Sequence, residues 1–400
     1  MNDYYADSLE QLAAGGRLRT LKPLVGRNGC RIVYKGREML NLTSNDYLGL
    51  AGDRQLHQKF YAAMHADNIL DNFGLGSASS RLLTGDSATA HILEETLRTT
   101  YGKEACLLFN SGYHANIGIL PALLGKNDLI LSDKLNHASI MDGMRLCQAQ
   151  HKRYRHCDYD HLAGLLDKYR KAFHRVVIVS ESVFSMDGDV ADLAQLVALK
   201  ERFDCLLYLD EAHAIGLYGN LGLGMAEEQG QLADIDFLVG TFGKALASVG
   251  AFVLCTATLR EYLINHSRSL IFTTALPPVV LFWNHFIFQE MLTCGARRTV
   301  LKALASILRQ NLRDNHLVTA GSTNIVPVML GDDALAVVLA EAMQEMGYLI
   351  FPVRPPTVPE GTSRFRLSLT ADMKEADIAL IASDLAGLMQ RSHNKFSAKS

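Results

Sequence analysis

The sequence lacks long blocks of like charge and long uninterrupted apolar runs. No five consecutive residues carry charge of one sign, and the formal net charge is −3. Proteins that bind nucleic acid or anionic membranes by charge usually carry a basic patch, so we expect neither partner. The longest apolar stretch, 271–288, is interrupted by two prolines and by Asn284 and His285. It predicts a turn and a buried helix, not a membrane span.

Paired cysteines and a secretion signal are also lacking. The seven cysteines are scattered, and none belongs to a Cys-x-x-Cys pair. This pattern favours reduced thiols in a cytoplasmic protein over a disulfide framework or a zinc site, so we expect no metal. The first seven residues are acidic and have no apolar core, which is not typical of a signal peptide.

The 400 residues, of which 48% are hydrophobic and 20% charged, have an ordinary globular composition and exceed the size of one compact core. Strands and helices alternate from 105 to 255, which predicts an α/β fold with a mostly parallel sheet flanked by helices. Strands near 324–329 and 364–369, with a helix at 332–346, predict a smaller α+β domain. We expect four parts: an N-terminal segment 1–50, a large domain 51–285, a small C-terminal domain 286–390, and a disordered tail 391–400.

The N-terminal segment has two predicted elements of its own. Apolar spacing indicates a helix over 7–20, and a hairpin follows over 30–42, with Gly36 in its turn.

A short apolar run at 237–241 is followed by Gly243 and Lys244. The run is too short and too β-branched for a helix, and Gly243 lets the backbone turn sharply. Among apolar neighbours a lysine loses solvation and its pKa falls, so its neutral amine becomes a nucleophile able to capture an aldehyde. The Thr241 hydroxyl is a candidate ligand for an anion. Taken alone, the pattern fits a surface lysine after an edge strand better.

The preceding predicted strand, 205–210, favours a functional role for Lys244. It ends in Asp210, and His213 follows three residues later. Ligands of open α/β sheets lie outside the carboxyl ends of the strands, so we expect Asp210 and Lys244 to converge there. An amine that captures an aldehyde and a carboxylate that keeps a ring nitrogen protonated are what pyridoxal 5'-phosphate (PLP) requires.

Four motifs carry a resemblance to a known family. The runs 209–213 (LDEAH), 241–244 (TFGK), 43–50 (TSNDYLGL) and 184–189 (FSMDGD) resemble the α-oxoamine synthases, which are fold type I PLP-dependent transferases. The resemblance extends from about Arg19 to about Asp377 and is closest to the biotin-pathway branch. Residues 77–79 depart from it, because many members have a glycine pair there.

The resemblance implies how PLP is held. Lys244 would carry the cofactor and later move the substrate α-proton, Asp210 would keep the ring nitrogen protonated, and His137 would stack on the ring. A lone histidine after a strand is otherwise more often structural. The further cofactor contacts implied are Gly112, Tyr113, Ser185, His213, Thr241, Thr273 and Thr274. Thr273 or Thr274 would reach the phosphate of a neighbouring subunit, which implies a homodimer with shared active sites.

Substrate residues are implied in the same way. Asn45 would lie beside cofactor and substrate, although a helix cap explains it too. Arg366 would bind the amino-acid carboxylate through its planar fork, while an edge strand kept soluble by charge is the structural alternative. Thr357 and Arg354 would contact the acyl thioester, and Arg19 completes the set.

The reaction implied is a decarboxylative condensation of L-alanine with an acyl thioester, either pimeloyl-CoA or a pimeloyl carrier protein. Three alternatives remain open at this point: a synthase that uses glycine and acetyl-CoA or another acyl chain, a PLP aminotransferase or lyase of the same fold, and a non-catalytic protein that has kept the fold. The joint presence of Lys244, Asp210, His137 and Arg366 argues against the last, because the fold alone does not require all four.

Overall fold

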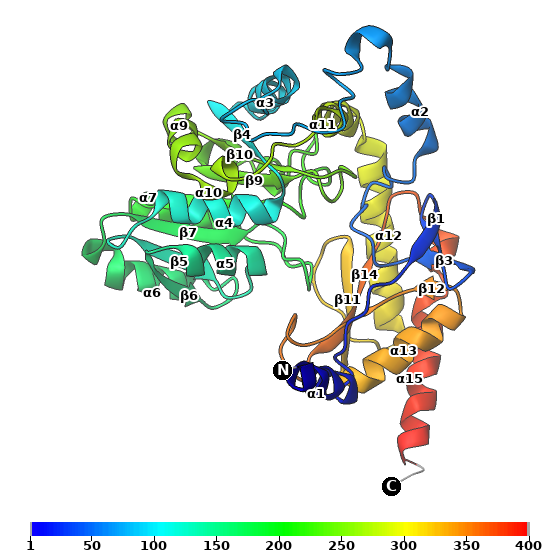
Figure 1. The fold of residues 1–400 in the computed structure, drawn as a ribbon. Helices are drawn as coiled ribbons and strands as arrows, with labels where there is room; N and C mark the ends of the chain where they lie inside the picture. Colours follow the sequence, from blue (N-terminus) through cyan, green and yellow to red (C-terminus); the bar gives the residue numbers. More distant parts are fainter. Residues whose placement is uncertain (1, 398–400) are drawn as a thin grey trace. The chain divides into compact units, whose positions relative to one another are not determined.

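The computed structural model describes residues 2–397, which form two compact units (Figure 1). The large unit comprises residues 54–184 and 190–295. The small unit comprises the chain up to Asp53, the short segment 185–189, and the chain from Ala296 onward.

The large unit is built on a mixed sheet with the strand order β4-β10-β9-β8-β7-β5-β6. Strands β9, β8, β7, β5 and β6 pair in parallel, whereas β10 is antiparallel to both β4 and β9. Most of these strands are buried along their whole length, as expected where helices cover both faces. The bounds are β4 Ala105–Phe109, β5 Leu129–Asp133, β6 Gln150–Tyr154, β7 Val176–Glu181, β8 Leu206–Asp210, β9 Phe237–Thr241 and β10 Ala251–Cys255.

Helix α4 lies on this sheet, as Figure 1 shows, and its apolar side chains form a core with alternate strand residues. Ile119 and Leu120 of α4 belong to the same buried cluster as Val177 and Val239. The helices of the large unit are α2 Arg54–Ala62, α3 Ala88–Tyr101, α4 Gly112–Leu123, α5 Ala138–Leu146, α6 Tyr159–Tyr169, α7 Leu193–Arg202, α8 Met225–Glu228, α9 Ala257–His266, α10 Arg268–Ile271 and α11 Pro278–Leu292, with 3-10 turns at Ala66–Asn68, Arg170–Ala172 and Leu232–Asp234.

The small unit contains two sheets, ordered β1-β2-β3-β12 and β11-β14-β13. The predicted hairpin is confirmed, and its two turn residues, Lys35 and Gly36, both have positive φ (50° and 74°), as a tight type I′ turn requires. The strands are β1 Leu24–Asn28, β2 Arg31–Tyr34, β3 Arg37–Asn41, β11 Ile325–Gly331, β12 Tyr348–Leu349, β13 Pro352–Val353 and β14 Ser363–Ser368. The helices are α1 Asn2–Ala14, α12 Gly295–Asp314, α13 Asp333–Glu345, α14 Glu375–Ile378 and α15 Ile381–Ser397.

The expected division of the chain differs from these units in two places. Residues 1–50 do not stand apart, because β3 pairs in parallel with β12 and so joins the small unit. The expected boundary at 285 falls inside α11, whose buried face (Trp283, Ile287 and Phe288) belongs to the large unit, and the division comes at Gly295 instead.

Two further expectations about the chain ends need correction. Helix α1 ends at Ala14 and not near residue 20, because Gly15 and Gly16 follow and Gly16 has φ +63°. The tail predicted over 391–400 is helical as far as Ser397, because α15 continues into it, while residues 398–400 lie outside the described part of the chain. Between residues 2 and 397, no helix has both the length and the apolar character needed to cross a membrane.

Candidate functional site

Lys244 comes three residues after the end of the buried strand β9, which is Thr241. The Thr241 hydroxyl accepts a hydrogen bond from the Gly243 N–H and donates one to the Gly250 carbonyl oxygen, each at 3.1 Å. The Phe242 N–H also donates to Gly250, at 3.0 Å. These bonds close the loop at the end of the strand. Lys244 lies in this loop and is half-buried. Within the chain, the Thr241 hydroxyl therefore shapes the turn.

Asp210 ends the neighbouring strand, β8, and is 5% exposed. The two strands are parallel, with Asp210 opposite Val239, so the expected convergence of their carboxyl ends is confirmed. One Asp210 oxygen, Oδ1, accepts the Ala212 N–H at 2.9 Å. The other, Oδ2, accepts the side-chain amide of Asn116 in α4, also at 2.9 Å. Asp210 is thus a buried carboxylate with a fixed orientation.

His137 lies at the N-terminus of α5, and the charges of Asp210 and Lys244 act on its imidazole. Burial lowers the pKa of its imidazole most strongly; the Lys244 charge lowers it further, and the Asp210 charge raises it. The residue nevertheless keeps an exposed surface. His137 therefore combines a neutral ring with an accessible surface, as stacking on a planar ligand requires.

Glu181, at the end of β7, is a site residue that the motif reading missed. Its carboxylate accepts the His137 N–H at 2.5 Å. Burial raises the pKa of Glu181 to about 8, the Asp210 charge raises it further, and Lys244 opposes the shift. A carboxylate at the end of an apolar strand, the signal that identified Asp210, was present here too.

The N-terminus of α4 offers an anion site near these groups. Ser111 caps the helix, and a Cβ atom placed on Gly112 would lie 3.8 Å from the Thr241 side chain. First-turn N–H groups have no partner within a helix and attract anions. Tyr113 is exposed, and its hydroxyl donates to Asp142 at 2.9 Å. Sequence reasoning placed Gly112 and Tyr113 at the cofactor phosphate, and the helix start suits that role.

Thr273 and Thr274 lie beside the same helix start. The Asn110 side-chain amide donates to the Thr273 hydroxyl oxygen at 3.1 Å and to the Thr274 carbonyl oxygen at 2.8 Å. Thr274 is the more exposed of the two, and its hydroxyl is not part of this contact. His213 is buried three residues after Asp210. The large unit therefore gathers Lys244, Asp210, His137, His213, Thr241, Gly112, Tyr113, Thr273 and Thr274 along one edge of its sheet.

In the small unit, the side chain of Arg366 in β14 donates hydrogen bonds to three other residues. Its guanidinium donates to the Ser185 carbonyl oxygen at 2.5 Å, to Asn45 Oδ1 at 3.2 Å and to the Tyr47 hydroxyl at 2.9 Å. All three partners are neutral, so the positive charge is left without a compensating carboxylate among the described residues. Asn45, Ser185 and Arg366 were predicted site residues; Tyr47, buried in the same cluster, was missed.

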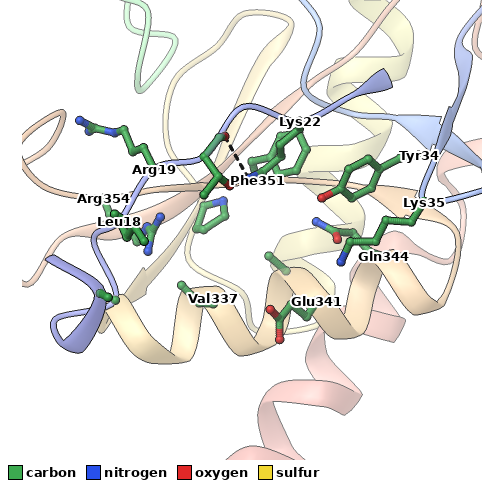
Figure 2. Close-up of a pocket in the computed structure, with 15 residues that line it drawn as sticks. Leu18, Arg19, Lys22, Tyr34, Lys35, Val337, Glu341, Gln344, Phe351 and Arg354 are labelled. Atoms are coloured by element: carbon green, nitrogen blue, oxygen red, sulfur yellow. Dashed lines mark hydrogen bonds between the residues drawn. The ribbon is translucent and has the colours of Figure 1, made fainter. Parts of the chain in front are cut away.

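Arg19, Arg354 and Thr357 form a second cluster in the small unit. Arg19 donates to the Thr357 hydroxyl oxygen at 3.1 Å. Burial lowers the pKa of Arg354 most strongly, the Arg19 charge lowers it further, and Asp333 opposes this shift. Both arginines line a groove of about 510 Å³ floored by α13 (Figure 2), with Lys22 and Lys35 on its other walls. The predicted substrate arginines thus belong to a basic concave surface.

Asp133, His156 and Cys157 are a candidate metal cluster, because one ligand atom of each lies within 4.8 Å of the others. Their geometry has another explanation. The Asp133 carboxylate already accepts His156 Nδ1 at 3.0 Å and the backbone N–H groups of Leu135 and Cys157 at 2.8 and 2.9 Å. We therefore regard the cluster as a hydrogen-bonded turn.

Comparison with known proteins decides the family. Residues 37–385 match the family model described as aminotransferase class I and II. The chain belongs to the aminotransferase class I and II family. A curated relative from Chlorobaculum parvum, named 8-amino-7-oxononanoate synthase, is 50% identical over 388 residues, which are 97% of this chain and 99% of the relative.

Two solved structures resemble nearly the whole chain. Serine palmitoyltransferase from Sphingomonas wittichii superposes with a TM-score of 0.88 at 31% identity, covering 98% of this chain and 97% of that one. The enzyme from S. paucimobilis, solved with PLP and myriocin, gives 0.88 at 29%, covering 97% of each. The predicted fold type I class and the resemblance to the α-oxoamine synthases are confirmed.

Proposed function

We propose that this protein condenses L-alanine with a pimeloyl thioester and gives 8-amino-7-oxononanoate, carbon dioxide and the free thiol, with PLP as cofactor. The observation that carries the proposal is the 50% identity, over nearly the whole chain, to the relative named 8-amino-7-oxononanoate synthase. The cofactor-type residues at one edge of the large unit's sheet support it independently.

The residues of the large unit fit PLP by their chemistry. The cofactor has an aldehyde, a ring nitrogen that needs a proton, a planar ring and a phosphate. Lys244 offers an amine, and Asp210 a buried carboxylate already fixed by two hydrogen bonds. His137 offers a ring with an accessible surface, and the start of α4 offers N–H groups for the phosphate. His213 completes the large unit's proposed contacts, at the ring oxygen. Ser185, which belongs to the small unit, is a further proposed contact of that oxygen.

When bound, PLP supplies an electron sink that stabilises negative charge at the α-carbon of the substrate. Residues of the protein then stabilise charges and transfer protons. Asp210 holds the proton on the ring nitrogen, because a buried carboxylate stabilises a neighbouring cation. Lys244 accepts the α-proton of alanine with its neutral amine. Arg366 binds the alanine carboxylate, and Asn45 and Tyr47 orient the Arg366 fork.

The atoms balance without a further reactant. A carbon–carbon bond forms between the alanine α-carbon and the thioester carbonyl carbon, and the thiol leaves. The alanine carboxylate then departs as carbon dioxide, and the α-carbon takes back a proton. Arg19, Arg354 and Thr357 bind the acyl thioester, since they lie together beside a basic groove.

A homodimer with shared active sites is part of the same proposal. Thr274 is the better candidate to reach a neighbouring subunit's phosphate, because the Thr273 hydroxyl already accepts Asn110 and Thr274 is more exposed. The condensation uses soluble metabolites, which supports a cytoplasmic location.

Complementation tests the function most simply. Expression of the protein in a bacterial biotin auxotroph that lacks this synthase should restore growth without biotin, whereas Lys244→Ala should not. Purified protein should also release thiol from pimeloyl-CoA only when L-alanine is present. Soluble protein that releases thiol with glycine and acetyl-CoA, or that turns alanine into pyruvate, would assign it to another branch of the family.

A further inference from the structure

A buried hydrogen-bond chain joins Asp210 and His137, two groups that we propose to face the cofactor. Asn116 of α4 is 1% exposed and lies at its centre. Its Nδ2 atom is 2.9 Å from Asp210 Oδ2 and 2.8 Å from Ser139 Oγ, and its Oδ1 atom is 2.5 Å from the Tyr208 hydroxyl. Ser139 Oγ in turn lies 2.7 Å from His137 Nδ1.

The direction of each bond follows from chemistry. An ionised Asp210 only accepts hydrogen bonds, so Asn116 must turn its Nδ2 toward it and its Oδ1 toward Tyr208. Tyr208 must then donate. Burial raises the pKa of its phenol well above the ordinary value, and Asp210 raises it further, so the proton stays on. The second Nδ2 hydrogen of Asn116 goes to Ser139 Oγ, which leaves the Ser139 hydroxyl hydrogen for His137.

The backbone at Ser139 fixes the histidine tautomer independently. The Ser139 N–H lies 3.2 Å from His137 Nδ1. A backbone N–H can only donate, so Nδ1 must carry a lone pair and no hydrogen. The Ser139 hydroxyl donates to the same atom. In the neutral imidazole the hydrogen therefore lies on Nε2.

We propose that Asn116 and Ser139 are positioning residues that hold His137 as its neutral Nε2–H tautomer and hold Asp210 in place for the ring nitrogen, through one hydrogen-bond chain that begins at Tyr208. Asn116 and Ser139 are each 1% exposed, so they would act through His137 and Asp210 and not by direct contact with a ligand. They make Nε2–H the single donor of the His137 ring. This inference rests on the proposed function for its catalytic meaning, but the tautomer itself does not depend on it.

The direct test is nitrogen NMR of the holoenzyme labelled with ¹⁵N-histidine, with the His137 signals assigned by their loss in His137→Gln. At pH 7.5, His137 should show a pyridine-like Nδ1 and a protonated Nε2. A protonated Nδ1 in the wild-type protein would overturn the proposal. Because this readout needs no turnover, it separates failure of the tautomer from failure of the proposed reaction.

Variants at Ser139 test the consequence. Ser139→Ala removes one donor to Nδ1, so kcat should fall about three- to tenfold, the factor expected for one hydrogen bond. Losing a donor to the neutral ring also favours its protonation, so the acid limb of the kcat profile should move to higher pH. Ser139→Thr keeps the hydroxyl and should restore both. The titratable groups around His137 are unchanged in these variants. They are Asp210, Lys244 and Asp142, whose charges act on its imidazole, and Glu181, which accepts its backbone N–H.

A matched control variant, Ser180→Ala, distinguishes the loss of this hydrogen bond from the general effect of removing a buried hydroxyl. Ser180 is also buried, and its hydroxyl donates to the Glu181 carbonyl oxygen at 3.0 Å, outside the chain of bonds described. Ser180→Ala should leave the kcat profile in place. An unshifted acid limb in Ser139→Ala, or an equal shift in Ser180→Ala, would refute the positioning role.

Discussion

Arg364 and Arg366 lie two residues apart on the same face of β14, but among the described residues only Arg364 pairs with a carboxylate, that of Asp187. Arg366 has neutral partners throughout. The charge of Arg364 is therefore compensated within the small unit, and that of Arg366 is left for a ligand. This difference supports the proposal that Arg366 binds the alanine carboxylate.

Replacing these two arginines should have different effects. Arg366→Lys loses the planar fork, so the KM for L-alanine should rise roughly 10- to 100-fold, as for a charge-assisted hydrogen bond worth about 1.5–3 kcal/mol. The KM for the thioester should change less than twofold. Arg364→Lys is the matched control: it should lower the thermal midpoint with little change in the alanine KM. An equal rise in the alanine KM in both variants would contradict the assignment.

We expect the cofactor to be attached covalently to the side chain of Lys244. Borohydride treatment of the holoenzyme should fix PLP covalently to the peptide that contains Lys244, as peptide mass spectrometry would show. Lys244→Ala should lose this attachment and at least about a thousandfold in kcat, because both the nucleophile and the base disappear. Lys134, which is exposed after β5, supplies the control, since Lys134→Ala should behave as the wild type. Label on a different lysine would refute the assignment.

Thr274 and Thr273 should differ in their effect on PLP affinity. Thr274→Val removes a hydroxyl proposed for the neighbouring subunit's phosphate, so the Kd for PLP should rise by about three- to tenfold. Thr273→Val removes the acceptor of Asn110 and should mainly affect stability. Titration of cofactor-free protein with PLP measures both, and equal Kd values for Thr274→Val and the wild type would contradict the proposal.

Glu181 should make stability depend on pH. Burial raises the pKa of Glu181 in the folded protein to about 8, from 4.5 for an ordinary glutamate. Between these values the folded protein keeps a proton that the unfolded chain has lost, so the free energy of unfolding should fall as pH rises, by up to about 1.4 kcal/mol per pH unit. Glu211, whose pKa burial raises to about 7, adds to the slope.

Urea unfolding of cofactor-free protein at pH 5.5, 6.5 and 7.5 measures this slope. Glu181→Gln should flatten it by as much as one proton's contribution, whereas Glu375→Gln, at an exposed position in α14, should not. Parallel slopes for the wild type and Glu181→Gln would show that Glu181 is ionised in the folded state.

The sequence predicted those parts of the fold that depend on uninterrupted burial. Strands β5, β7, β9 and β10 are buried along their whole length and begin with apolar runs, so their positions and the groups that follow them, such as Lys244, could be predicted directly. Strand β6, with the sequence QHKRY, was missed because it is mostly exposed and takes its place in the sheet from pairing with β5 alone.

The missed site residues depend on contacts between distant parts of the chain. Asn116 is an ordinary polar residue inside a helix until folding brings it to Asp210, 94 positions away. Tyr47 resembles a core tyrosine, and its role follows only from its hydrogen bond to Arg366. Such roles are set by tertiary packing and leave no local pattern.

Isotope tracing tests the central claim most directly. The enzyme would be given L-alanine labelled with ¹³C in its carboxylate, together with pimeloyl-CoA, and labelled carbon dioxide, free thiol and product would be measured by mass spectrometry. We predict one labelled carbon dioxide per thiol released and an unlabelled product with the mass of 8-amino-7-oxononanoate. Labelled pyruvate without thiol release, or a product that retains the label, would contradict decarboxylative condensation.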